Sequence, residues 1–234
     1  MQNASSVKRI LLKLSGEVLG GPQGMGLDAE TLEKFAGIIG EISKRYEIAI
    51  VTGGGNIMRG KATRGLDRAK ADQIGMMATV VNCMTLEQHL IAKGYDACAM
   101  SSVPSLARPY DIPAARKLLE KHTIVLVAGG TSNPYFTTDS AAALRALELN
   151  CDLLIKATKV DGVYTADPAK DPNAKRYETL KLADAISAGL GVMDLTAMIL
   201  CKENGLSLRV CAVDSLSRFD GIIDGSERST LVTP

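Results

Sequence analysis

Two positively charged side chains lie beside glycine-rich turns in this sequence. Lys13 is one residue from the end of the apolar stretch RILLKL, with Ser15 and Gly16 after it, and Arg59 follows the glycine run 53–55. A lysine in a buried strand is unfavourable unless its ammonium group reaches water or an anion. Because glycine turns present backbone N–H groups to anions, the two cations predict phosphate binding. The alternatives are a Lys13 side chain that extends to solvent and a solvated surface Arg59.

A third glycine turn carries many small polar groups. In the stretch VAGGTSNPYFTTDS (127–140), five serine and threonine hydroxyls and one carboxylate follow an apolar strand and lead into an alanine-rich helix. Gly130 would let a ligand approach the backbone, and Thr138 or Asp139 would cap the helix and direct its positive end toward that ligand. This pattern favours a site for a phosphorylated, hydroxyl-bearing small molecule. A long ordered loop with ordinary helix capping is the alternative.

Residues 55–62, GNIMRGKA, come close to the P-loop pattern GxxxxGK[ST] without matching it. Ala62 stands where the pattern needs a hydroxyl group for magnesium, and the polar, glycine-containing residues that follow do not suit a packed helix. A P-loop is therefore not favoured.

Composition narrows the class of protein. The 234 residues carry 27 Lys and Arg against 26 Asp and Glu, so no strong field gathers nucleic acid or an anionic membrane. The five cysteines show no CxxC spacing, which favours reduced thiols in the cytoplasm over a zinc or redox site. No apolar run reaches the roughly 18 residues of a membrane span. His89 and His122 lie in helical contexts, which does not favour a Ser-His-Asp triad.

Apolar patterns predict alternating strands and helices along the chain. Several strands are apolar throughout, which is typical of a largely parallel sheet covered on both faces, and no linker divides residues 1–234. Asp28 is predicted to cap the first long helix. The expected strands are 7–14, 47–52, 96–101, 123–128, 152–157, 207–213 and 229–233. The expected helices are 28–45, 67–93, 112–122, 138–149, 181–189 and 193–204, with a polar loop over 157–178.

Five segments together resemble the bacterial uridylate (UMP) kinases of the amino acid kinase superfamily. They are KLSGE, GGGN…RG, NPYFTTD, KATKVDGVYTADP and VMDLTA, and the resemblance covers essentially the whole chain. It implies a single α/β domain, a three-layer αβα sandwich around a largely parallel twisted sheet. It also implies the reaction MgATP + UMP → ADP + UDP in pyrimidine nucleotide biosynthesis. The alternatives are another superfamily kinase that phosphorylates a carboxylate or carbamate, and a non-catalytic nucleotide-binding protein.

The resemblance also implies site residues by matching position. Those expected at ATP are Lys13, Leu14, Ser15, Gly16, Gly55, Arg59, Thr158, Tyr164 and Asp167. Those expected at UMP are Gly54, Asp72, Thr131, Ser132, Asn133, Pro134, Tyr135, Phe136, Thr137 and Thr138. Those expected to act in catalysis are Lys13, Arg59, Asp139 and Asp194. Ser132 and Tyr135 depart from the family, which usually has Gly and Phe there.

Cofactor, regulators and assembly are likewise expectations from the resemblance. Mg²⁺ would be held mainly through the nucleotide phosphates, with no dedicated metal site in the protein. The segment Gly21, Pro22, Gln23, Gly24, Met25 and Gly26 matches a region that the family associates with activation by GTP. UTP would inhibit, and the chain would form a homohexamer.

Overall fold

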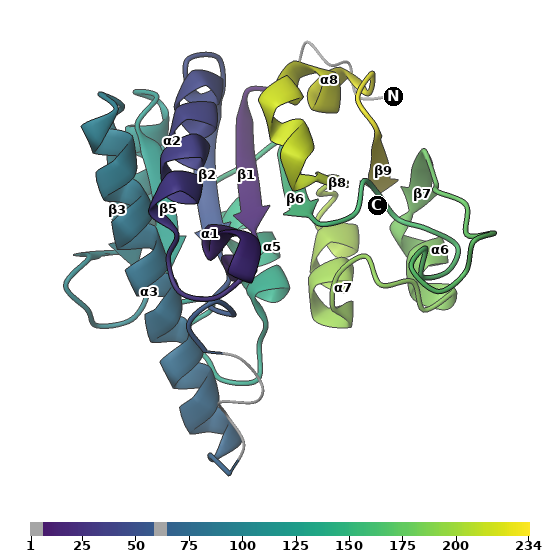
Figure 1. The fold of residues 1–234 in the computed structure, drawn as a ribbon, viewed down its shortest axis with the longest axis horizontal. Coiled ribbons are helices and arrows are strands. Elements are labelled where there is room, and N and C mark those ends of the chain that lie inside the picture. Colours follow the sequence, from purple (N-terminus) through teal and green to yellow (C-terminus); the bar gives the residue numbers. More distant parts are fainter. Residues whose placement is uncertain (1–6, 59–64) are drawn as a thin grey trace.

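The computed structural model describes residues 7–58 and 65–234, and their strands form one nine-stranded sheet (Figure 1). The strand order is β4-β3-β5-β2-β1-β6-β8-β9-β7, and every neighbouring pair is parallel except β8 with β9. The bounds are β1 Arg9–Leu14, β2 Glu47–Thr52, β3 Ala97–Ser101, β4 Arg108–Pro109, β5 Ile124–Ala128, β6 Leu153–Thr158, β7 Thr179–Lys181, β8 Leu208–Ala212 and β9 Ser229–Thr233. The predicted largely parallel α/β sheet is confirmed.

Helices cover both faces of this sheet, so the predicted three-layer arrangement is also confirmed (Figure 1). One apolar core joins the sheet to α1 (Gly16–Leu19), α2 (Ala29–Ser43), α3 (Arg68–Ala92) and α8 (Phe219–Asp224). The other core joins it to α4 (Ile112–Leu119), α5 (Thr138–Glu148), α6 (Leu182–Ser187) and α7 (Leu195–Glu203). Short 3₁₀ helices span Gly21–Gln23 and Val213–Arg218.

The alternation of side chains along β1 decides where its lysine lies. Leu12 and Leu14 belong to the core under α2 and α3, whereas Leu11 belongs to the core under α5. Because successive side chains point to opposite faces of a sheet, Lys13 lies on the α5 face. The same alternation in β6 places Lys156 on that face, and the register pairs it with Lys13. Two lysines on neighbouring strands therefore point the same way.

Helix capping agrees with the sequence at α2 and differs at α5. The Asp28 carboxylate accepts a hydrogen bond from the Thr31 N–H at 2.8 Å, so its predicted role as N-cap is confirmed. The cap of α5 is Thr137, and the prediction of Thr138 or Asp139 was wrong. Thr137 has an extended backbone, so its hydroxyl reaches the N–H groups of Asp139 and Ser140. Thr138 already has helical geometry, from which a side chain does not reach these groups.

Several short elements have no clear counterpart in the apolar pattern. They are β4, β7, α1, α8 and the two 3₁₀ helices. Each has too few residues to show a hydrophobic period.

Among the described residues no helix combines the length and apolar character that crossing a lipid bilayer requires, although α3 has 25 residues.

Candidate active site

The three glycine turns follow neighbouring strands of the sheet. In the order β5-β2-β1, the strands end at Ala128, Thr52 and Leu14, and because they are parallel their turns lie at one edge. The turns after β1 and β2 are in contact. A Cβ atom on Gly16, in the turn after β1, would lie 2.4 Å from the carbonyl oxygen of Gly53, in the turn after β2. Only glycine fits at Gly16, and its turn packs directly against the second one.

Lys13, Asp139 and Lys156 form an ion cluster behind these turns. The Lys13 Nζ lies 2.8 Å from Asp139 Oδ1, and the Lys156 Nζ lies 2.8 Å from Asp139 Oδ2. Lys156 also donates to the Val192 carbonyl at 2.7 Å. All three ionic side chains are 13–15% exposed. One carboxylate thus fixes the ammonium groups of two adjacent strands.

The pKa shifts in this cluster follow from burial and from charge. Burial opposes ionisation of Asp139, but Lys13 and Lys156 outweigh it and hold the pKa of that carboxyl below its ordinary value. Burial also lowers the pKa of Lys156, and the Asp139 carboxylate opposes this shift without cancelling it. Asp139 is therefore a stable anion, and Lys156 releases its proton more easily than an exposed lysine.

Lys156 was absent from the residues proposed from the sequence. The signal was present, because DLLIKA places a lysine in an apolar strand just as RILLKL does around Lys13. What the sequence lacks is the strand order. Only the pairing of β1 with β6 brings the two lysines side by side beneath Asp139.

Asp194 lies nearby but has different partners. It caps α7 by accepting from the Ala197 N–H at 2.9 Å. Its oxygens also accept from the hydroxyls of Ser140, at 2.9 and 3.0 Å, and of Thr137. Because Thr137 and Ser140 belong to the first turn of α5, Asp194 joins the N-termini of α5 and α7. The structure therefore brings the two predicted acidic residues to the same helix end.

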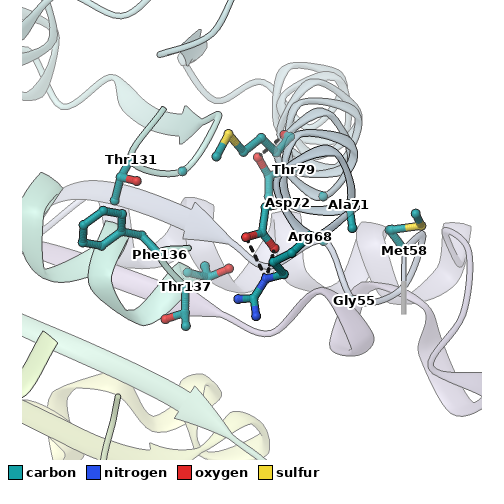
Figure 2. Close-up of a pocket in the computed structure, with 14 residues that line it drawn as sticks. Gly55, Met58, Arg68, Ala71, Asp72, Thr79, Thr131, Phe136 and Thr137 are labelled. Carbon is teal, nitrogen blue, oxygen red and sulfur yellow. Dashed lines mark hydrogen bonds and ion pairs between the residues drawn. The ribbon is translucent and has the colours of Figure 1, made fainter. Parts of the chain in front are cut away.

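A cavity of about 410 Å³ opens between α3 and the turn after β5 (Figure 2). Arg68 and Asp72 of α3 face Phe136 and Thr137 across it. The Arg68 Nε donates to both Asp72 oxygens, at 2.9 and 3.0 Å, and the Tyr135 N–H donates to Asp72 Oδ2 at 2.8 Å. Burial opposes ionisation of Asp72, yet these donors keep its pKa below the ordinary value. The cavity wall thus contains an ionised carboxylate.

Six of the ten residues expected at UMP line this cavity, namely Gly54, Asp72, Thr131, Phe136, Thr137 and Thr138. Four do not line it, namely Ser132, Asn133, Pro134 and Tyr135. Ser132 and Tyr135 have left-handed backbones, with φ of 69° and 71°. The Ser132 hydroxyl donates to the Ser102 carbonyl at 2.9 Å, and the Tyr135 ring lies 5.6 Å from the Arg68 guanidinium. Of these two, Tyr135 contacts the lining residues Arg68 and Asp72.

A second cavity, of about 480 Å³, lies beyond the end of β6. Its lining includes Lys156 and three residues expected around the ATP nucleoside, Thr158, Tyr164 and Asp167. Among the other residues expected at ATP, Lys13 lies in β1, and Ser15 and Gly16 form the start of α1. Gly55 lines the first cavity. The Leu14 side chain is fully buried, so only its backbone is available to a ligand. Arg59 lies outside the described residues.

The segment 21–26 contacts the second glycine turn. The Gly26 N–H donates to the Asn56 carbonyl at 2.9 Å, and the Asn56 side chain donates to the Gly26 carbonyl at 2.7 Å. Asn56 is buried and exchanges amide hydrogen bonds with Asn82 of α3, at 2.8 and 2.9 Å. Residues 21–24 line a separate cavity of about 410 Å³ together with Lys34 and Lys159.

The chain matches the sequence profile of the Amino acid kinase family over residues 8–212. The chain belongs to the amino acid kinase family. The matched range contains Lys13, Asp139, Lys156 and Asp194.

Relatives within the family are similar over nearly the full length. A uridylate kinase from Rickettsia bellii is 46% identical, with 96% of each chain covered, and one from Rickettsia prowazekii is 46% identical, with 98% of this chain and 97% of that protein covered. A crystal structure of UMP kinase from Ureaplasma parvum superposes with a TM-score of 0.92 at 36% identity, covering 97% of this chain and 99% of that one. UMP kinase from Bacillus anthracis gives 0.91 at 34% identity, with 97% and 96% covered.

The acidic residues of the site are already engaged by protein groups. Both Asp139 oxygens face ammonium groups, and both Asp194 oxygens accept hydrogen bonds. Over residues 7–58 and 65–234, no three or more His, Cys, Asp or Glu side chains gather as metal ligands. This donor set fits a magnesium ion that arrives bound to nucleotide phosphates better than one held by the protein alone.

Proposed function

We propose that this chain transfers the γ-phosphoryl group of MgATP to UMP and so produces ADP and UDP for pyrimidine nucleotide biosynthesis. The observation that carries the proposal is the position of the Lys13–Asp139–Lys156 cluster between two cavities. Lys156 lines the cavity beyond β6, and Thr138, which precedes Asp139, lines the cavity beside α3. The uridylate kinases that resemble the chain from end to end support this substrate pair.

Each cavity has features that suit one nucleotide. ATP would occupy the cavity of Thr158, Tyr164 and Asp167, with its phosphates toward Lys13 and the first glycine turn. UMP would occupy the cavity beside α3, where the Asp72 carboxylate can accept a hydrogen bond from a ribose hydroxyl. The remaining residues expected from the family resemblance keep their proposed roles, with Arg59 as a further cation. The two substrates would then meet at the cations behind the glycine turns.

The chemistry needs charge stabilisation more than proton transfer. The second pKa of a phosphate monoester is about 6, so the attacking oxygen of UMP is already ionised at neutral pH. A bond forms between this oxygen and the γ-phosphorus while the bond to the ADP oxygen breaks. Lys13 and Lys156 would stabilise the charge on the transferred group, and Asp139 would hold both ammonium groups in place. Magnesium would supply additional charge neutralisation while bound to the ATP phosphates.

Assembly and regulation complete the proposal. An apolar stripe on α3 is 44–46% exposed and consists of Ile74, Met77, Val81 and Ile91. Its exposure supports pairing with a second copy of the chain in a homo-oligomer. The family resemblance implies a hexamer. GTP would activate through segment 21–26, whose bonds to Asn56 connect it to the second glycine turn, and UTP would inhibit. A cytoplasmic location would keep the five free cysteines reduced.

An assay of ADP release with ATP and a panel of acceptors tests the function. We expect turnover with UMP and much less with CMP, dUMP, carbamate or an amino-acid carboxylate. The same assay with added GTP or UTP tests regulation, and light scattering of Met77→Glu tests the α3 stripe. Turnover of a carboxylate or carbamate without turnover of UMP would assign the chain to another branch of the family.

A further inference from the structure

A buried arginine lies beneath the glycine turn that borders the proposed UMP cavity. Arg145 of α5 is 5% exposed, and its Nη2 donates to the Gly130 carbonyl at 2.8 Å. The Ser102 hydroxyl donates to the same carbonyl at 3.3 Å. Gly130 has a left-handed backbone, with φ of 60°, and lines the cavity together with Thr131. A full positive charge therefore acts on one peptide group of the cavity wall.

The geometry of that peptide determines what it presents to a ligand. The structure has no cis peptide bond among the described residues, so the Thr131 N–H points away from the Gly130 carbonyl. Arg145 binds the carbonyl from the face of the sheet covered by α5, whereas the cavity lies on the side of α3. Thr131 lines the cavity, and its N–H has no acceptor among the described residues, so this N–H is available to a ligand there.

Other side chains fix the orientation of this guanidinium. The Arg145 Nη1 donates to Glu148 Oε2 at 2.6 Å, and the guanidinium carbon lies 4.6 Å from the centre of the Tyr110 ring. The Tyr110 hydroxyl donates to the same Glu148 oxygen at 2.9 Å. Burial, together with the Glu148 carboxylate, raises the pKa of Tyr110, so this donor stays protonated. The planar guanidinium is therefore held between a ring and a carboxylate, with Nη2 aimed at the turn.

The contacts of the Arg145 guanidinium fix its orientation more than the stability of the fold requires. The Arg145 Nε is buried without a hydrogen-bond partner among the described residues. A buried cation that leaves a donor unsatisfied is costly, and an apolar side chain would fill the same space at less cost. What an apolar side chain would not do is fix the Gly130–Thr131 peptide.

We propose that Arg145 is a positioning residue for the acceptor nucleotide: by holding the Gly130 carbonyl, it directs the Thr131 N–H at an oxygen atom of the bound nucleotide. The inference rests on the proposed function, since it assigns the acceptor to the cavity beside α3. Loss of Arg145 weakens binding of the acceptor and leaves binding of ATP largely unchanged, because the ATP cavity lies beyond β6.

Steady-state kinetics of Arg145→Met and Arg145→Lys test this role. For Arg145→Met we expect KM for UMP to rise about tenfold, as for the loss of one hydrogen bond, while KM for ATP stays within about twofold. Arg145→Lys retains the positive charge but replaces the two guanidinium nitrogens that bind Glu148 and Gly130 with a single nitrogen, so its KM for UMP should be intermediate. The increase in Tm that UMP produces should be largest for wild type, smaller for Arg145→Lys and smallest for Arg145→Met. The increase in Tm that ATP produces should be the same in all three.

Arg116→Met is the matched control. Arg116 is also an arginine that binds a backbone carbonyl. Its Nε and Nη2 donate to the Glu148 carbonyl, at the C-terminal end of α5, at 2.8 and 2.5 Å, and no contact joins it to the Gly130 turn among the described residues. It should lower Tm without raising KM for UMP. If Arg145→Met does not fold, Arg145→Lys and Glu148→Gln carry the test, each with a rise of about threefold or more in KM for UMP.

The results separate the two ideas. Wild-type protein that does not phosphorylate UMP would contradict the proposed function itself. Wild-type protein that phosphorylates UMP, with folded Arg145 variants that keep its KM, would overturn the positioning role alone. An equal rise in KM for ATP and UMP would also overturn it, because it would indicate a general structural defect.

Discussion

Asp139 and Asp194 both lie at the N-terminal end of α5, but their partners differ in charge. Both Asp139 oxygens face ammonium groups at 2.8 Å, from Lys13 and Lys156. Within residues 7–58 and 65–234, the Asp194 oxygens accept from neutral groups only, namely two hydroxyls and the Ala197 N–H. The first carboxylate holds charges in position, and the second holds two helices together. Two aspartates at the same helix end therefore have different structural roles.

The difference follows from where each aspartate lies relative to the sheet. Asp139 is in the first turn of α5, above the ends of β1 and β6 where the two lysines lie. Asp194 precedes α7, and its side chain reaches back to the first turn of α5. We expect substitutions around Asp139 to change turnover, pH dependence and stability, and those around Asp194 to have smaller effects that arise from helix capping and geometry.

The largest effect should come from the charge that Asp139 positions. Lys13→Ala should lower kcat at least about 10²-fold, the typical loss for one electrostatic donor in a transition state, while the fold stays intact. Circular dichroism and the ADP-release assay measure the two properties. Lys8→Ala is the matched control, because Lys8 directly precedes β1 and its side chain is 72% exposed beside Glu47. Near-normal turnover of Lys13→Ala would remove Lys13 from the mechanism.

Asp139→Asn should affect stability as well as turnover. Removal of this carboxylate leaves two buried ammonium groups without their shared anion, at a cost of about 3 kcal/mol in the free energy of unfolding. The pKa of Asp139 is lowered in the folded state, so its stabilisation is complete above the ordinary value of 3.8 and is lost as pH falls through the folded pKa. Urea unfolding should show a difference between wild type and variant at pH 7 that shrinks below pH 3.8.

Asp194→Asn should have a smaller effect than either change. An asparagine retains one oxygen that can accept from Thr137, Ser140 or Ala197, but not all the present bonds at once. We expect about a tenfold fall in kcat and a loss of about 1 kcal/mol in stability, as for a weakened helix cap. If Asp194→Asn lowered kcat as far as Lys13→Ala does, Asp194 would have to act on the reacting groups directly, and the contrast between the two carboxylates would fail.

Lys156→Arg should change the pH dependence more than the rate at neutral pH. Burial lowers the pKa of Lys156 from the ordinary value of 10.5, so wild-type activity should begin to fall on the alkaline side below that pH. An arginine stays charged throughout this range, and the alkaline limb of kcat should therefore move to higher pH. At pH 7 the loss should be less than about tenfold, because the positive charge remains.

The same lysine shows how far sequence reasoning reached. The glycine turns, the strands around them and the long helix α3 could be predicted because each has a distinct local pattern. Lys156 could not be paired with Lys13 from the sequence, because that requires knowing that β1 lies between β2 and β6. The contacts of Arg145 were hidden for a related reason, since its partners Gly130 and Tyr110 come from other parts of the chain.

The cap of α5 illustrates a finer limit. Thr137, Thr138 and Asp139 are all suitable N-caps by residue type. Which one takes the position depends on where the backbone turns from extended to helical, and that is set by tertiary contacts such as the bond from Thr137 to Asp194. The residue pattern therefore placed the helix start at residue 138, as the structure has it, but could not select the capping side chain.

Ser132 extends the comparison to the turn after β5, where its hydroxyl has a neutral partner and the effects should be smallest. Its left-handed backbone is a conformation that glycine adopts more easily, and its hydroxyl donates to the Ser102 carbonyl at 2.9 Å. Ser132→Ala keeps the strain and loses the bond, so it should lower stability by about 1 kcal/mol. Ser132→Gly loses the same bond but relieves the strain, so its Tm should lie between those of Ser132→Ala and wild type. If Ser132→Gly were the less stable of the two variants, strain would be too small to matter at this position.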